Sequence, residues 1–467
     1  MAGKGTWVTK TDLLRYVRCP YAFWLLATGR ISFDDTVTEF QQRLLTDGVE
    51  FQALVESSLA PIVIKQDERK QLLTEEIAVL GTPHFENRAL RIRGQPDGID
   101  MAGGALYPIE VKSHKNTERI DELELAFYWL LLAPYRTREV KPEGRLILRR
   151  DGNPFPLTVP IADHRIAEVR ALLPQVRKAR RYGVKPRVCR CRVCSSVRRD
   201  EVLTSVIRRK DNSMVFGVGR EYSRVLDEFG LATWQSLLGA NVDDLATQFS
   251  ERGYKAVATA EVRRWQLHAQ SYQLGGPVLS ADATPLPVPG PYIALDLEYD
   301  STVWLIGTCL VDGEARDYEA LWANSAAEEK ANLTRLAELV ATHPELPVVT
   351  WAGDSADIPN LRKAALRHRC PQMFDDLGAR HVDAYRWLYQ NLRLPITGFT
   401  LKEVGKYYGV PRLSMVADGF QALLLYQEQR ETNDQTIRSR LVDYNRDDLD
   451  ALIEVTGQLR QLSAFGT

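Results

Sequence analysis

Two consecutive strand-like apolar runs are the most constraining feature of this 467-residue chain. The runs are YIALDLEY, at residues 292–299, and VWLIGTCLV, at residues 303–311, and the turn signal Asp312-Gly313 follows the second run. Helical segments come next and are interrupted by another strand-like run, LPVVTW. Alternation of strands with helices predicts a layered α/β domain in this part of the chain.

The chain is longer than a single domain with one hydrophobic core usually is, and its pattern of predicted helices and strands divides it into blocks. Residues 1–200 mix helical patterns with short strand-like segments, and residues 201–275 are helical. Residues 276–290 are rich in Pro and Gly, which is typical of a linker. Residues 291–467 contain the α/β pattern. We therefore expect an α/β multidomain protein with three structured parts and one linker.

Composition excludes several classes of protein. With 45% hydrophobic and 26% charged residues, the chain is typical of soluble globular proteins, and it has no run of about 18 apolar residues that would predict a membrane span. The segment MAGKGTWVTKTDLL has no apolar stretch typical of a secretory signal, so we expect a cytoplasmic protein without a membrane partner. Basic residues gather between positions 177 and 199, which is compatible with a phosphate-binding surface or with a solvated face.

Carboxylates in the C-terminal block have a spacing that suits a divalent cation. Asp296 and Glu298 lie two positions apart on a predicted strand, so both point to the same face. Neighbouring carboxylates repel each other when both are ionised, and Mg²⁺ or Mn²⁺ relieves that repulsion at an all-oxygen site. Tyr444 and Asp448 lie four positions apart, which places both on one face of a helix. Asp357 lies between the two pairs, in SADIPNL.

This order of residues resembles the DEDD exonucleases with a tyrosine, which have an RNase H-like fold. The resemblance covers about residues 290–460 and includes HVDAYRWL and GFTLKEVGKYYGV, which are similar to the middle section of that group. It implies two-metal trimming of 3′ ends in the 3′–5′ direction. Asp354 competes with Asp357 for its role, and Asp447 and Asp450 compete with Asp448. The resemblance implies four metal ligands and one residue that positions the attacking water: Asp296, Glu298, Asp357 and Asp448, and then Tyr444.

A second acidic pattern lies in the N-terminal block. Asp97 lies in the turn-prone RGQPDGID, and YPIEVKSHK follows with Glu110 and Lys112 on one face of a predicted strand. The two acids can hold a metal, and the lysine ammonium can orient a water or neutralise charge on a phosphate. The alternative is an ordinary Glu/Lys pair on a solvated strand.

This second pattern resembles the PD-(D/E)xK nuclease core, which has a restriction-endonuclease-like fold. More narrowly, residues 7–200 resemble the RecB-like group with an iron–sulfur cluster. The resemblance implies that Asp97 and Glu110 bind metal and that Lys112 is catalytic. Two positions depart from the group: Gln52, near Glu50, takes the place of a metal-binding His, and Glu124 takes the place of a Gln in ELAFY.

Four cysteines have the ligand count of a metal-binding cluster. Cys19 lies in VRCPYAFWL, and VCRCRVC contains Cys189, Cys191 and Cys194. Four thiolates suit a [4Fe–4S] cluster or Zn²⁺, and the RecB-like resemblance alone favours iron–sulfur. Ligands so far apart would join the start of the domain to its end, which is a structural role. Cys309 and Cys370 read as ordinary buried thiols.

The helical block contains VFGVGREYSRVLDEFG, which resembles the hairpin of a helix–hairpin–helix module that binds DNA. Gly217 and Gly219 would let backbone N–H groups approach a phosphate at a helix N-terminus. The alternative is a plain turn between two helices.

The whole chain resembles bacterial RecB-like nucleases fused to an RNase H-like domain. We expect an enzyme, a metal-dependent DNA nuclease with two sites, that acts on single-stranded DNA or on 3′ ends in DNA processing, repair or defence. The alternatives are an RNA exonuclease, a DNA-end-binding scaffold with one active site, and a scaffold with neither site active. The sequence has no Walker-type phosphate-binding motif, so unwinding would require a separate helicase.

Overall fold

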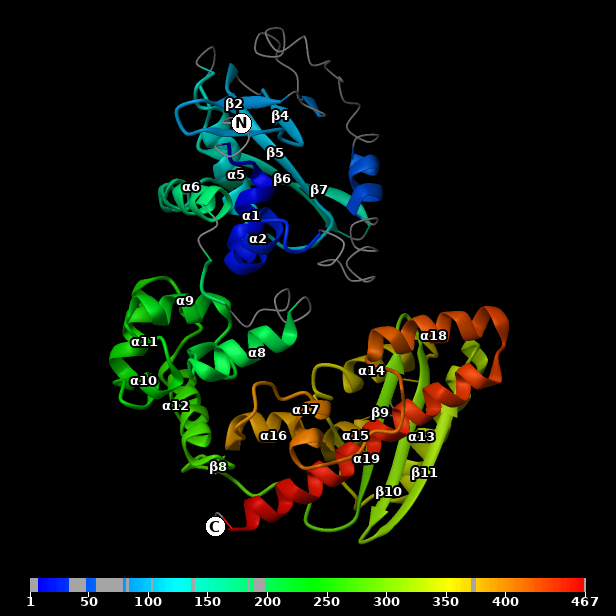
Figure 1. Ribbon diagram of the computed structural model, residues 1–467. Coiled ribbons are helices and arrows are strands. Elements are labelled where there is room, and N and C mark those ends of the chain that lie inside the picture. Colours follow the sequence, from blue (N-terminus) through cyan, green and yellow to red (C-terminus); the bar gives the residue numbers. More distant parts are fainter. Residues whose placement is uncertain are drawn as a thin grey trace. The chain divides into compact units, whose positions relative to one another are not determined.

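The computed structural model describes residues 7–32, 48–55, 79–80, 84–101, 104–135, 139–150, 152–182, 185–188, 198–370 and 375–465. The chain divides into two compact units, Met1–Arg208 and Arg209–Thr467 (Figure 1). Each unit combines helices with a mixed sheet, so the predicted α/β class is confirmed. Among the described helices, none combines the length and the apolar character needed to cross a membrane.

A five-stranded sheet lies at the centre of the first unit, in the order β1-β4-β5-β6-β7. β5 and β6 are parallel and are connected through α5 (Arg119–Leu132), whereas the other neighbouring pairs are antiparallel. A parallel pair needs such a crossover connection. A separate hairpin is formed by β2 (Phe85–Asn87) and β3 (Ile92–Gly94). The strands of the sheet are β1 (Val79–Leu80), β4 (Gly98–Asp100), β5 (Tyr107–Lys112), β6 (Glu143–Arg150) and β7 (Asn153–Pro160).

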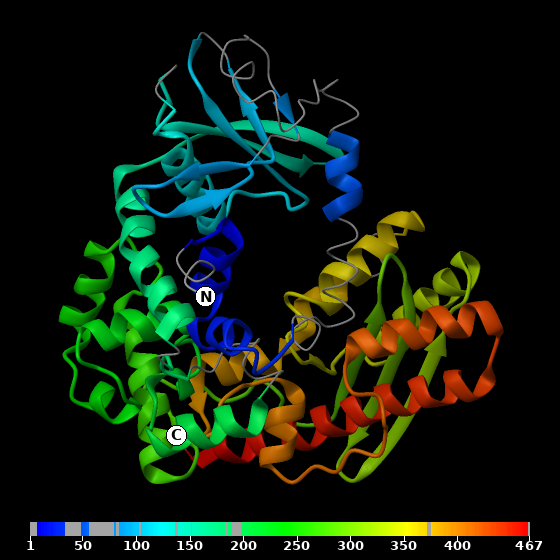
Figure 2. The same cartoon turned by 45° about the horizontal axis from the view of Figure 1, so that its top comes forward.

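The first two helices of the chain lie close to this sheet (Figure 2). α1 (Lys10–Arg18) begins at a capping box in which the side chains of Thr9 and Asp12 each accept the backbone N–H of the other residue. α2 (Pro20–Ala27) begins with a proline. Proline suits this position because the N–H that it lacks would have no hydrogen-bond partner within the helix. α1 packs against α5 and against α6 (Asp163–Tyr182), and α8 (Arg199–Arg208) ends the unit. Most side chains of α5 are buried, so α5 anchors this arrangement.

Some residues of the basic segment hold the first unit together. The Arg180 guanidinium lies 2.6 Å from a carboxylate oxygen of Asp12, and Arg177 donates to the backbone oxygen of Leu90 at 2.8 Å. These contacts tie α6 to α1 and to the turn before β3. They account for part of the basic run without a nucleic-acid partner.

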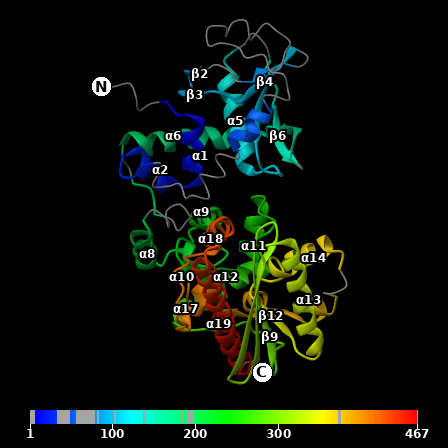
Figure 3. The same cartoon turned by 90° about the vertical axis from the view of Figure 1, so that its right-hand side faces the viewer.

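The sheet of the second unit has the order β11-β10-β9-β12-β13 (Figures 1 and 3). β9, β10 and β11 form an antiparallel meander, and β12 and β13 add parallel to β9. The strands are β9 (Tyr292–Tyr299), β10 (Val303–Asp312), β11 (Ala315–Trp322), β12 (Val348–Thr350) and β13 (His381–Asp383).

Alternate residues of β9 face different helices. Ile293, Leu295 and Leu297 share a core with residues of α13 (Ala326–Thr342) and α14 (Asp357–Arg367). Tyr292 and Ala294 belong to a different core, to which α19 (Gln435–Phe465) contributes. Because side chains on a strand alternate between its faces, the even-numbered acids of β9 lie on the same side as α19.

The helical segment that precedes this domain packs into the same unit. The Phe216 ring stacks on Phe399, with ring centroids 4.7 Å apart. The buried His268 accepts the backbone N–H of Phe216 at 2.7 Å through Nδ1, and its Nε2 lies 2.9 Å from the backbone oxygen of Ile396. The remaining helices of the unit are α9 (Arg220–Glu228), α10 (Trp234–Leu238), α11 (Val242–Glu251), α12 (Thr259–Leu274), α15 (Asp375–Arg380), α16 (Ala384–Asn391), α17 (Leu401–Tyr407) and α18 (Gly419–Thr432).

The segment predicted as a linker, residues 276–290, is packed rather than loosely extended. Within it, β8 (Val278–Leu279) pairs with β14 (Leu392–Arg393), and Leu286 and Val288 are buried in the core. Its Pro and Gly residues indicated a linker. They gave no sign of a pairing partner more than 100 positions further along the chain.

Candidate functional site

Three acidic side chains from two elements meet in the second unit. Asp296 and Glu298 lie on β9, and Asp448 lies on the facing side of α19. One oxygen of each lies within 4.8 Å of the others. Glu298 and Asp448 are buried, and Asp296 is partly buried. The spacing of two on the strand and the crossing of α19 over the same face produce this cluster, which we call the C-terminal cluster.

Burial and mutual repulsion shift the protonation of these acids. Burial raises the pKa of Asp296 well above its ordinary value, and the charges of Glu298 and Asp448 raise it further. Burial, followed by the charge of Asp448, raises the pKa of Glu298 to about 8. The Asn445 amide donates to a carboxylate oxygen of Asp296 at 2.7 Å. A close group of buried oxygen donors that resist ionising together has the chemistry that Mg²⁺ or Mn²⁺ complements.

Asp357 begins α14 and is buried, but it is not one of the three acids within 4.8 Å. Its charge raises the pKa of both acids on β9, so it faces the same site. Burial and the neighbouring Asp383 raise the pKa of Asp357 itself to about 7. The competing residue, Asp354, lies instead 2.8 Å from the Arg386 guanidinium and 3.4 Å from the His381 ring.

The acids beside Asp448 on α19 have other partners. Asp447 accepts the backbone N–H groups of Leu413 and Ser414, at 3.0 and 2.7 Å. Asp450 lies 3.6 Å from the Arg316 guanidinium. Both therefore serve to hold neighbouring segments.

Two cations and a tyrosine border the C-terminal cluster. The Lys402 ammonium donates to the Tyr444 hydroxyl at 3.1 Å and lies 4.6 Å from the centre of its ring. Arg412 forms an ion pair with Asp448. Burial raises the pKa of Tyr444 far above its ordinary value, so its hydroxyl stays protonated. The sequence analysis did not identify either cation, although Lys402 lies in the segment that resembles the DEDD group.

A second cluster, the N-terminal cluster, forms in the first unit. Asp97 lies just before β4, and its carboxylate accepts the backbone N–H of Val111 at 3.0 Å. Glu110, on β5, is 1% exposed. Lys112 lies 2.8 Å from Glu110 and 2.6 Å from Glu124 of α5. Glu124 lies where the resemblance leads us to expect a glutamine, and it is a second acidic partner of Lys112.

Lys10, which the sequence analysis missed, also belongs to the N-terminal cluster. Its ammonium lies 3.0 and 3.2 Å from the two oxygens of Glu110 and 4.0 Å from an oxygen of Asp97. Burial alone would raise the pKa of Glu110, but Lys10 and Lys112 lower it. Burial and the charge of Glu110 raise the pKa of Asp97 to about 6 and that of Glu124 to about 8. No local sequence pattern links Lys10 to acids so distant along the chain.

The other predicted site residues have separate surroundings. Gln52 and Glu50 lie on an unlabelled helix, residues 48–55, where Gln52 is partly buried and Glu50 is exposed. Cys19 is buried at the start of α2, and its sulfur accepts the backbone N–H of Ala22 at 3.3 Å. Cys189, Cys191 and Cys194 lie outside the described residues, so the four-cysteine cluster stays a prediction.

The two glycines of the helical hairpin differ in their surroundings. Gly217 has a left-handed backbone (φ 87°), and a Cβ there would lie 2.7 Å from a carboxylate oxygen of Glu261. Gly219 caps α9 and donates its N–H to the backbone oxygen of Gly217 at 2.9 Å. Local geometry therefore explains Gly217, whereas a Cβ at Gly219 would meet no neighbouring atom among the described residues, and the contact of both glycines with DNA stays a prediction.

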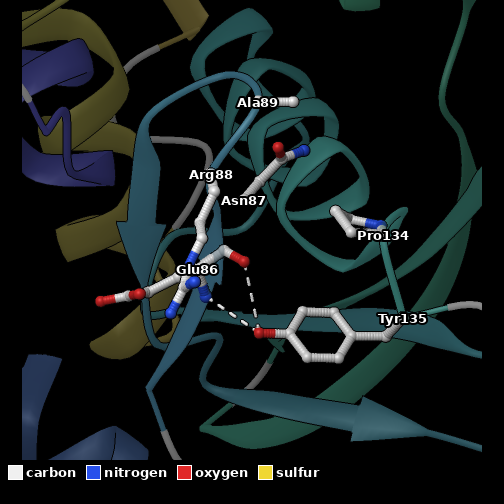
Figure 4. Close-up of a pocket in the computed structure, with 6 residues that line it drawn as sticks. All are labelled: Glu86, Asn87, Arg88, Ala89, Pro134 and Tyr135. Atoms are coloured by element: carbon white, nitrogen blue, oxygen red, sulfur yellow. Dashed lines mark hydrogen bonds between the residues drawn. The ribbon is translucent and has the colours of Figure 1, made fainter.

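The first unit also contains a pocket that has no predicted site residue in its lining (Figure 4). The Tyr135 hydroxyl hydrogen-bonds with the backbone N–H and backbone oxygen of Glu86, at 3.1 and 3.3 Å. The pocket is lined by Glu86, Asn87, Arg88, Ala89, Pro134 and Tyr135.

The arrangement of the second unit defines its class. Three antiparallel strands, two further strands parallel to the first of them, and acids where β9 meets α19 form an RNase H-like domain. Residues 294–460, somewhat more than a third of the chain, match the family model of the RNase H superfamily. The match confirms the RNase H-like part of the predicted fold and indicates nuclease-type, hydrolytic activity on a nucleic acid. A search of curated proteins gave no match.

Proposed function

We propose that the protein is a metal-dependent nuclease whose active site is the C-terminal cluster. The observation that carries this proposal is the convergence of Asp296, Glu298 and Asp448 within 4.8 Å inside an RNase H-like domain. These three acids, with Asp357 as the fourth ligand, would hold Mg²⁺ or Mn²⁺. A divalent cation bound there would polarise a phosphoryl oxygen and activate a water molecule for attack on phosphorus.

Tyr444 acts as a hydrogen-bond donor to the attacking water. Its raised pKa keeps the hydroxyl neutral, which excludes a role as a base. Because Lys402 already donates to the phenolic oxygen, the hydroxyl hydrogen can be directed to another acceptor. Arg412, which pairs with Asp448, brings positive charge to the place where a phosphate would approach.

We further propose the DEDD type of reaction, removal of nucleotides from 3′ ends of DNA. The order of the four acids and the tyrosine supports this assignment. Single-stranded DNA and duplexes with a 3′ end are the expected substrates, in DNA processing, repair or defence, with any unwinding supplied by a separate helicase. Backbone groups near Gly217 and Gly219 would contribute phosphate contacts. RNA is the alternative substrate, since RNase H-like exonucleases act on either nucleic acid.

The N-terminal cluster is proposed as a second nuclease-type site of the RecB-like class. Asp97 before β4 and the Glu110–Lys112 pair on β5 support this assignment, as does the crossover from β5 to β6 through the buried helix α5. A [4Fe–4S] cluster, or Zn²⁺ as the alternative, would be held by the four predicted cysteines and would stabilise this unit.

The test is degradation of 3′-labelled and 5′-labelled single-stranded DNA, duplex DNA and RNA in Mg²⁺ or Mn²⁺. Asp296→Asn, Lys112→Ala, the double variant and Asp450→Asn as a matched control on α19 are compared with the wild type. Loss of activity in Asp296→Asn, with Asp450→Asn unaffected, is the expected result. Activity that persists in Asp296→Asn but disappears in Lys112→Ala would assign hydrolysis to the first unit. An inactive wild type on every substrate would overturn the proposal.

A further inference from the structure

Lys10 occupies an unusual place for a lysine. It is the first residue of α1, where the helix dipole disfavours positive charge. Its side chain is only 22% exposed, and its ammonium contacts both oxygens of Glu110 and lies 5.1 Å from the centre of the Tyr128 ring. The neighbouring acids compensate for both costs. The charges of Glu110 and Asp97 outweigh burial and raise the pKa of Lys10, so it remains a cation.

The position of this cation matters for metal binding. A divalent ion shared by Asp97 and Glu110 would need their oxygens at about 2.0–2.6 Å. The Lys10 ammonium already lies 3.0 Å from Glu110 and 4.0 Å from Asp97, so it stands in the space where such an ion would bind. Two like charges in one partly buried space repel strongly, so the lysine and the metal exclude each other.

The C-terminal cluster is different in this respect. Within residues 198–370 and 375–465, no lysine or arginine forms an ion pair with Asp296 or Glu298. The only ion pair to the three converging acids in those ranges is that of Arg412 with Asp448. Two of its acids therefore contact no ammonium or guanidinium group in these ranges, whereas both candidate metal ligands of the N-terminal cluster contact an ammonium.

We propose that Lys10 is the resident cation of the N-terminal cluster and that this cluster binds a divalent metal ion only when the Lys10 ammonium is displaced or removed. The inference rests on the proposed nuclease-type nature of this cluster and adds a residue that controls its metal occupancy. While the Lys10 ammonium is in place, the N-terminal cluster therefore holds no divalent ion. After displacement of Lys10, the Glu110 carboxylate would contact Lys112 and the bound metal ion.

The experiment measures Mn²⁺ binding to the full chain by electron paramagnetic resonance of the free ion. All Lys10 variants are made in a protein that already carries Asp296→Asn, which disables the C-terminal cluster. Comparing this parent with the wild type gives the number of ions that the C-terminal cluster binds. In this background, Lys10→Met, which keeps length and removes charge, should bind an additional Mn²⁺ at least about tenfold more tightly than its parent. Lys10→Arg keeps the charge and should not. Lys141→Met, at an exposed lysine paired with Glu139, is the control.

Adding Glu110→Gln to Lys10→Met should abolish the new binding, which assigns it to this cluster. The second measurement is the thermal midpoint of unfolding with and without Mn²⁺. Lys10→Met should be less stable than its parent without Mn²⁺ and should gain more stability from Mn²⁺ than the parent does. Equal Mn²⁺ affinity of the parent and Lys10→Met, whether strong or absent, would overturn the proposal. An equal number of bound Mn²⁺ ions in the wild type and in Asp296→Asn would overturn the proposed C-terminal metal site and would leave the inference about Lys10 unaffected.

Discussion

Replacing Glu298 by glutamine should stabilise the metal-free protein, because burial and the charge of Asp448 disfavour the ionised form of Glu298 in the folded state. Burial and the charge of Asp448 raise the pKa of Glu298 from 4.5 to about 8. A carboxyl group with a higher pKa in the folded state than in the unfolded state lowers stability as pH rises. The penalty is absent below about pH 4.5, grows between the two pKa values and is complete above about pH 8.

The magnitude follows from the size of the shift. At pH 7 the folded state keeps this carboxyl group mostly protonated, whereas the unfolded state ionises it. This difference in protonation opposes folding by up to about 3 kcal/mol, from about 1.4 kcal/mol for each pH unit above the ordinary pKa. Glu298→Gln removes this penalty and leaves a side chain of similar size. The variant should therefore exceed the wild type in stability at pH 8 and should match it closely at pH 5.

The assay is urea or thermal unfolding at pH 5 and pH 8, with and without Mg²⁺. Mg²⁺ should stabilise the wild type at pH 8 more than it stabilises Glu298→Gln, because the variant has lost one of the carboxylates that bind the cation and whose repulsion the cation relieves. Glu319→Gln, at a surface acid that pairs with Arg335, is the matched control. A wild type that loses no stability relative to Glu298→Gln between pH 5 and pH 8 would refute the electrostatic reasoning.

Three further predictions concern the supports of the two clusters. Lys402→Met should lower nuclease activity by about tenfold to a hundredfold with little change in fold, since the Tyr444 hydroxyl loses its donor; kcat and a melting curve check this. Gly307→Ala should lower both stability, by about 1–3 kcal/mol, and activity, because its Cβ would lie 1.8 Å from the Asn445 side chain; unchanged unfolding and activity would contradict the packing described. Lys112→Met should destabilise the first unit by about 3–5 kcal/mol, since the buried Glu124 loses its ammonium partner and the buried Glu110 keeps only Lys10, and denaturant unfolding of the variant measures it.

Local periodicity explains how much of the C-terminal cluster could be predicted. A spacing of two placed Asp296 and Glu298 on one face of a strand, and a spacing of four placed Tyr444 and Asp448 on one face of a helix. The structure has β9 and α19 at those positions, and it brings the two pairs together because α19 lies over that face of the sheet. The partner Asn445 was not predicted, since its amide reaches Asp296 only through this crossing.

Contacts between distant segments explain what the sequence analysis missed. Lys10 lies 100 positions before Glu110, and the packing of α1 against α5, which itself packs against β5, brings the two side chains together. The segment 276–290 has the composition of a linker, yet Leu286 and Val288 are buried by the domain that follows. The composition of a segment indicates its conformational freedom, whereas its burial depends on residues elsewhere in the chain that pack against it.

The most direct measurement of the central claim is a crystal structure of the protein with Mn²⁺, in which anomalous scattering locates the ion. The account predicts an anomalous peak at the C-terminal cluster, with oxygens of Asp296, Glu298 and Asp448 at about 2.0–2.3 Å from it. The same crystals should show no peak between Asp97 and Glu110 while Lys10 is present. Absence of a peak at the C-terminal cluster, or a peak only at the N-terminal cluster, would contradict the account.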